Sequence, residues 1–71
     1  MNIKLGLYQH FKGHRYVVNA IARHSETLEE YVVYTRENNP DDVWIRPATM
    51  FLEDVEVNGV VVKRFTFLGD I

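Results

Sequence analysis

A chain of 71 residues is long enough for one domain, and its small core excludes a large enzyme with a deep, water-excluding cleft. The hydrophobic fraction of 46% and the charged fraction of 25% are ordinary for a folded protein and argue against a disordered one. The sequence has no cysteine, which excludes disulfides, thiolate nucleophiles and zinc sites with sulfur ligands. We therefore expect residues 1–71 to form a single small domain.

Charge is distributed unevenly along the chain. The net charge of -2 divides into +4 over residues 1–25 and -6 over residues 26–71, and the first acidic residue is Glu26. A local cationic surface attracts anionic partners, whereas the overall charge gives no case for nucleic acid. No apolar run reaches the length of a membrane-spanning segment or of a signal-peptide core. We expect a cytoplasmic protein without a membrane partner.

The first predicted elements form a β-hairpin. Residues 15–23 are rich in β-branched and aromatic side chains and contain no glycine or proline, which is typical of a strand. Residues 31–35 have the same character, and the polar residues 25–29 between the two segments predict their connection. Residues 36–42 concentrate turn-forming residues around a proline and predict an exposed loop.

A short strand and a helical turn are predicted next. Residues 43–46 read as a strand that stops at Pro47, because proline cannot donate a hydrogen bond to a neighbouring strand. Residues 48–52 predict one helical turn, with Met50 and Phe51 pointing inward.

The Asn58-Gly59 pair predicts a second hairpin, because both central residues of a type I′ turn need a positive φ. It joins residues 54–57 to a returning strand over residues 60–67. Four to five short antiparallel strands and one helical turn near 48–52 predict a mainly β fold, a small SH3-like barrel, with an OB-fold as the second choice. We expect the core to contain Tyr16, Val18, Ile21, Val33, Ile45, Met50, Phe51 and Phe65.

Four motifs occur in order along the chain: YxHFKGxxY from Tyr8, IARHSET from Ile21, VVY from Val32 and WIRPxxMF from Trp44. Together they resemble a small bacterial family that is catalogued as a domain of unknown function and grouped by fold with SH3-type barrels. The resemblance runs from Tyr8 to Phe67, implies the barrel and supplies no activity. The chain differs from the expected pattern at Leu28, where we expect a glycine, and in the loop at residues 38–40.

Two constellations suggest chemistry, and both have a simpler interpretation. His10, His14 and His24 would form a metal site only if the fold brought the loop ends together, and surface histidines that form hydrogen bonds explain them better. The residues His24-Ser25-Glu26 have the types of a hydrolytic triad, but consecutive residues point in different directions and cannot form a relay. We therefore expect no catalytic residue, no metal site and no cofactor.

The aromatic residues divide into two groups. We expect Phe11, Phe51, Phe65 and Phe67 to be structural, since aromatic side chains in a small domain are mostly core. Trp44 stands two residues before Arg46, where it fits either a lid on the core or part of a recognition groove.

A non-catalytic interaction module that binds a protein or peptide is the favoured function. Two alternatives stay open: weak nucleic-acid or nucleotide binding through a cationic and aromatic face, and a small metal-dependent or hydrolytic enzyme. The identity of the partner and the formation of a homo-oligomer are also open. The candidate binding residues carry a positive charge or a ring beside one, and they are His10, Lys12, Arg15, Arg23, His24, Trp44 and Arg46.

Overall fold

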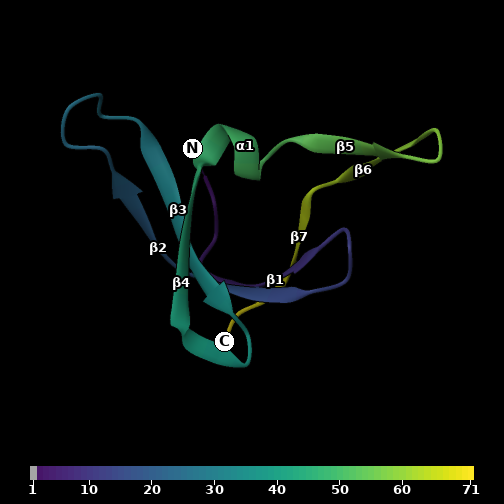
Figure 1. The fold of residues 1–71 in the computed structure, drawn as a ribbon, viewed down its shortest axis with the longest axis horizontal. Helices are drawn as coiled ribbons and strands as arrows, with labels where there is room; N and C mark the ends of the chain where they lie inside the picture. Colours follow the sequence, from purple (N-terminus) through teal and green to yellow (C-terminus); the bar gives the residue numbers. More distant parts are fainter. Residues whose placement is uncertain (1) are drawn as a thin grey trace.

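The computed structural model describes residues 2–71 as a five-stranded antiparallel sheet from which a two-stranded arm projects (Figure 1). The elements in chain order are β1 (Gly6–His10), β2 (Arg15–Arg23), β3 (Glu30–Arg36), β4 (Asn39–Pro47), α1 (Ala48–Phe51), β5 (Asp54–Val57), β6 (Val60–Lys63) and β7 (Phe65–Gly69). The large sheet has the order β4-β3-β2-β1-β7, and β5 pairs with β6 in the arm.

The predicted fold class, a small and mainly β domain with one helical turn, is confirmed. Seven strands are present instead of four or five, because β1 was not predicted and one predicted strand is divided. The sheet curls around a core, and β4 and β7 remain its two edges over residues 2–71. In the same part of the chain, no helix is long and apolar enough to cross a membrane.

A β-bulge determines which side chains of β2 face the core. The pairing of β2 with β3 shifts register between Val18 and Ala20, so Asn19 is an extra residue. Val18 and Ile21 therefore both face the core although they are three residues apart, and each lies opposite a buried residue of β3. The side chain of Asn19 donates a hydrogen bond to Oγ1 of the buried Thr35 at 3.3 Å.

The core lies on the inner side of the curled sheet, under α1. Its buried hydrophobic residues are Tyr8, Val18, Val32, Tyr34, Ala48, Phe51 and Phe65, so three of the eight predicted core residues are confirmed as buried. Tyr16 and Ile21 are partly buried against this cluster. Val33 is partly buried on the outer side of the sheet.

Two predicted core residues are exposed. Ile45 is 64% exposed because it lies opposite Val33 on the outer side of the sheet, which no other described element covers. Met50 is 44% exposed because a single helical turn presents only one side to the core, and Ala48 and Phe51 occupy that side. The prediction that Ile45 and Met50 are core residues was wrong.

The predicted loop at residues 36–42 is mostly strand. β3 continues to Arg36 and β4 already begins at Asn39, so only two residues turn the chain. Pro40 fits into β4 because β4 is an edge strand, where a residue without an N–H group leaves no partner unsatisfied.

The predicted turn at Asn58-Gly59 is confirmed. Asn58 and Gly59 have φ values of 51° and 79°, and Val57 lies opposite Val60, as in a type I′ turn. The returning strand at 60–67 is divided at Arg64, whose N–H donates to the carbonyl of Glu53 at 3.0 Å. β6 therefore belongs to the arm and β7 to the large sheet.

Replacing Gly59 by valine should destabilise the protein by about 1 kcal/mol or more, because a β-branched residue is strained at positive φ. Thermal unfolding followed by circular dichroism measures the change. Asn58→Gly is the control, since glycine accepts the φ of 51° and should leave the melting temperature almost unchanged. Equal melting temperatures for Gly59→Val and the original chain would contradict the turn assignment.

Leu28 occupies the turn position at which the sequence analysis expected a glycine, and its φ is 65°. The side chain is 65% exposed, so its removal loses little packing. Leu28→Gly should raise the stability by about 0.5–1 kcal/mol, because the cost of the left-handed conformation exceeds the entropy that glycine adds to the unfolded chain. The matched control is Leu52→Gly, at an exposed leucine with a φ of -87°, which should lower the stability.

Candidate functional site

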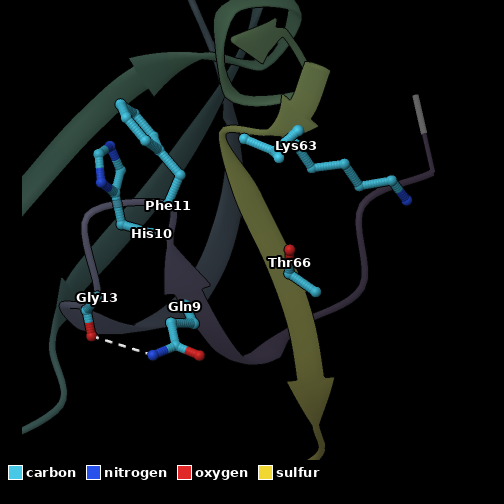
Figure 2. Close-up of a pocket in the computed structure, with 7 residues that line it drawn as sticks. Gln9, His10, Phe11, Gly13, Lys63 and Thr66 are labelled. Atoms are coloured by element: carbon cyan, nitrogen blue, oxygen red, sulfur yellow. Dashed lines mark hydrogen bonds between the residues drawn. The ribbon is translucent and has the colours of Figure 1, made fainter. Parts of the chain in front are cut away.

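The turn between β1 and β2 is held by its own hydrogen bonds. The N–H of His10 donates to the carbonyl of His14 at 2.8 Å, and the N–H of Gly13 donates to the carbonyl of His10 at 2.7 Å. Gly13 has a φ of 103°, a value that side chains rarely adopt. The amide of Gln9 donates to the carbonyl of Gly13 at 3.2 Å, as Figure 2 shows. The turn is therefore a fixed platform for the imidazole of His10.

His10 is held in one orientation and one tautomer. Its Nδ1 accepts a hydrogen bond from the N–H of Lys12 at 3.2 Å, so the neutral ring carries its proton on Nε2. The ring lies beside Phe11 with centroids 4.5 Å apart (Figure 2) and meets Phe65 edge to face at 4.9 Å. Burial lowers the pKa of His10, and the positive charges of Arg46, Arg64, Lys12 and His14 lower the pKa further.

Arg46 supplies the permanent positive charge of the site. β4 places it opposite the buried Val32, on the inner side of the sheet, and its Nε donates to the hydroxyl of Tyr34 at 3.4 Å. The guanidinium carbon lies 5.8 Å from the centroid of Phe65, within the range of a cation–π contact. Arg46 is partly buried, and it takes part in none of the ion pairs found among the described residues.

Trp44 completes what we call the cationic–aromatic cluster: His10, Tyr34, Trp44, Arg46 and Phe65. Trp44 lies opposite Tyr34 and two residues before Arg46, so its side chain leaves the same side of β4. It is 48% exposed and forms part of the surface instead of the core. Arginine and an exposed tryptophan side by side are suited to hold an anionic group that is attached to apolar surface.

Arg64 lies close enough to His10 for its positive charge to lower the pKa of the imidazole. Its Nη2 lies 3.8 Å from Oε1 of Glu53, and its Nε is buried without a hydrogen-bond partner among the described residues. Sequence reasoning missed both Arg64 and Tyr34. Arg64 was detectable as one of two adjacent charged residues, with Lys63, that interrupt the apolar run at 60–67, whereas Tyr34 stood in the VVY motif with no signal that it belongs to a site.

The other predicted site residues lie elsewhere. Arg15 faces the outer side of the sheet beside Gln9 and lies 3.8 Å from a carboxylate oxygen of Glu37. Lys12 belongs to the β1–β2 turn, where its Nζ lies 5.9 Å from the centroid of Phe11.

Arg23 and His24 lie at the β2–β3 connection. Arg23 is directly opposite Glu30 in the hairpin, and His24 uses its Nδ1 to accept hydrogen bonds from the N–H groups of Glu26 and Thr27 at 3.1 and 3.2 Å. The structure therefore brings together His10 and Arg46, places Trp44 beside Arg46 and keeps Lys12 next to His10, whereas Arg15, Arg23 and His24 lie elsewhere. No group of three metal-ligating residues occurs within residues 2–71.

A shallow cleft of about 410 Å³ lies between the β1–β2 turn and the base of the arm. Its lining residues are Gln9, His10, Phe11, Gly13, Val62, Lys63 and Thr66. In Figure 2 the rings of His10 and Phe11 lie on one side of β7, and the side chain of Lys63 extends on the other. His10 thus belongs both to the cationic–aromatic cluster and to the wall of this cleft.

The pKa of His10 should depend on the charge of Arg46. We expect its pKa to lie below the ordinary value of 6.5, and Arg46→Gln should raise the pKa by removing a nearby positive charge. A lowered pKa means that the unfolded chain binds a proton more readily, so stability is complete above pH 6.5 and falls as the pH drops toward the pKa of the folded state. NMR titration of the imidazole protons measures the pKa, and an unchanged value in Arg46→Gln would contradict the proximity of the two charges.

Comparisons with known proteins identify the family of the chain. The model of a family described as a protein of unknown function, DUF1653, matches residues 6–67. A crystal structure of a DUF1653 protein from Bordetella bronchiseptica aligns with a TM-score of 0.85 and 30% identity, covering 99% of this chain and 92% of that one. No curated protein is significantly similar in sequence. The chain therefore belongs to the DUF1653 family of proteins of unknown function.

Proposed function

We propose that the protein is a non-catalytic interaction module that binds an extended, acidic segment of a partner protein at the cationic–aromatic cluster. The observation that carries the proposal is Arg46, a partly buried cation on an edge strand that takes part in none of the ion pairs of the described residues. A buried or half-buried guanidinium is stabilised by a carboxylate, and in this cluster a ligand would supply that carboxylate.

The position of Arg46 on β4 supports an extended ligand. β4 is an edge of the large sheet over the described residues, so its outer backbone groups can pair with an added strand. Val43, Trp44 and Ile45 are exposed in succession along this strand, which is unusual for an edge that natural proteins protect from pairing. A partner strand beside β4 would cover these side chains and place an acidic residue next to Arg46.

A peptide fits the charges better than a nucleic acid does. A nucleic-acid strand presents a row of phosphates and needs several free cations along its path. Three arginines of this chain lie within 4 Å of carboxylates, namely Arg15, Arg36 and Arg64. Within the cationic–aromatic cluster, one available guanidinium beside a histidine whose pKa is lowered matches one or two carboxylates of a peptide instead.

Selection of short random peptides displayed on phage tests the proposal. We expect the selected peptides to be enriched in Asp and Glu. Their binding should shift the backbone amide resonances of β4 and raise the pKa of His10. Arg46→Gln should weaken their binding about tenfold, which corresponds to about 1.4 kcal/mol. Arg23→Gln, a change at an arginine opposite Glu30, is the matched control and should have little effect.

Two outcomes would overturn the proposal. One is equal peptide affinity in Arg46→Gln and Arg23→Gln. The other is binding of oligothymidylate with a steep salt dependence while no displayed peptide is selected, which would assign the face to nucleic acid.

A further inference from the structure

We propose that the protein has a second site, sharing only Phe65 with the cationic–aromatic cluster, that binds a small aromatic carboxylate. The site is a cavity of about 320 Å³ between the N-terminal segment, α1 and the strands β6 and β7. Its lining residues are Asn2, Lys4, Tyr8, Phe51, Leu52, Lys63, Phe65 and Phe67. The volume lies at the lower end of the range of about 300–1,000 Å³ that small-molecule sites occupy. It suits a ligand of one or two rings.

The floor of the cavity is built from fixed aromatic rings. Phe51 and Phe65 are stacked, with centroids 4.1 Å apart and planes inclined by 7°. Tyr8 meets Phe51 edge to face at 5.2 Å and Phe67 at 5.3 Å, and its hydroxyl donates to the carbonyl of Lys4 at 2.7 Å. Because these rings are already fixed, the partly buried Phe67 and the outer edges of the others can contact an incoming ring without a large loss of side-chain entropy.

The charged groups of the cavity are cationic. Lys4 and Lys63 line it from different segments, and none of its lining residues is acidic. The Nζ of Lys4 lies 5.1 Å from the centroid of Phe67, so one ammonium group is already at the edge of the aromatic floor. Lys63 lies opposite Asp54 in the hairpin, and neither lysine takes part in an ion pair found among the described residues.

Two ammonium groups beside aromatic rings favour a ligand that has both a carboxylate and an aromatic ring. A ring of the ligand would pack on Phe67 and Leu52, above the buried Phe51 and Phe65, and its carboxylate would lie between the two lysines. An aliphatic acid would use the same charges but would lose the contacts between rings. A macromolecular segment has too little room, because the cavity is of small-molecule size.

NMR titration with 2-naphthoate tests the inference, with 2-naphthamide as the neutral analogue and octanoate as the aliphatic one. We expect 2-naphthoate to bind with a Kd of about 1 mM or tighter, to shift the resonances of the lining residues and to give intermolecular contacts with Phe51 and Phe67. The amide and octanoate should each bind at least about fivefold more weakly.

Lysine variants test whether Lys4 and Lys63 bind the carboxylate of the ligand. The double change Lys4→Gln and Lys63→Gln should weaken 2-naphthoate binding about tenfold, whereas Lys12→Gln, at a lysine outside the cavity, should not. Arg46→Gln should also leave this binding unchanged, which separates the site from the peptide face. The inference is overturned if 2-naphthoate causes no shifts near the cavity, if the double variant binds it as well as the original chain, or if octanoate binds more tightly.

Discussion

Replacing Phe51 by alanine should leave most of the protein unfolded at room temperature. Phe51 is 2% exposed, stacks on Phe65 and meets Tyr8 and Tyr34 edge to face. Truncating a buried phenylalanine costs about 3–5 kcal/mol, because apolar burial is lost and a cavity remains. A core of this size supplies only about 3–5 kcal/mol of net stability, so the loss in Phe51→Ala is comparable with the whole free energy of unfolding. Urea denaturation followed by tryptophan fluorescence measures it.

The neighbouring methionine provides the control for this experiment. Met50 belongs to the same helical turn but is 44% exposed, so Met50→Ala should cost less than about 1 kcal/mol. A folded Phe51→Ala variant with dispersed NMR resonances would show that the stacked pair is not central to the core. Equal losses of stability in Phe51→Ala and Met50→Ala would contradict the assignment of Phe51, and not Met50, to the side of α1 that faces the core.

Elements whose signals are local could be predicted from the sequence. The β2–β3 hairpin follows from two runs of β-branched residues, and the arm follows from Asn58-Gly59, whose φ values only a few residue types accept. In both cases a few adjacent residues carry the whole signal. The expectation of a glycine at position 28 came instead from the family resemblance, and the φ of 65° at Leu28 fits it.

Side-chain direction could not be predicted, because it depends on pairings between distant segments. The side of β3 that faces the core carries Val32 and Tyr34, whereas the sequence analysis chose Val33 and its partner Ile45. Both sides of β3 are apolar, so alternation gives no preference between them, and a shift by one residue exchanges the two sides. The outcome depends on α1 and Phe65, which are far away in sequence.

The β3–β4 connection and β1 show two further limits. Residues 36–42 contain strong turn formers, but the edge position of β4 removes the usual cost of a proline in a strand. β1 contains Gly6 within a short run and therefore lacks a strand signal of its own. Its conformation depends on pairing with β2 and β7.

The candidate site could be predicted only in part, for the same reason. Charge clustering near the N-terminus selected His10, and the Trp44-x-Arg46 spacing selected one side of β4. The charge clustering also selected Arg15 and Arg23, because the sequence does not reveal that Glu37 lies beside Arg15 and Glu30 opposite Arg23. Tyr34, whose hydroxyl contacts Arg46, became part of the site only through the register of β3 and β4.

Gly6 shows how a missing side chain can control the fold, and Gly6→Ala should be nearly as destabilising as the loss of Phe51. A Cβ at this position would lie 2.5 Å from the carbonyl oxygen of Gly69 and 3.1 Å from the ring of Phe67, and the φ of 140° disfavours every L-residue. The backbone of β7 must move, which disturbs its pairing with β1, so we expect a loss of about 3 kcal/mol or more. Gly69→Ala is the matched control, because φ is 153° there but nothing lies within 4 Å of the added carbon. Urea denaturation of both variants separates the clash from the backbone strain, and equal losses would contradict the close approach of β1 and β7.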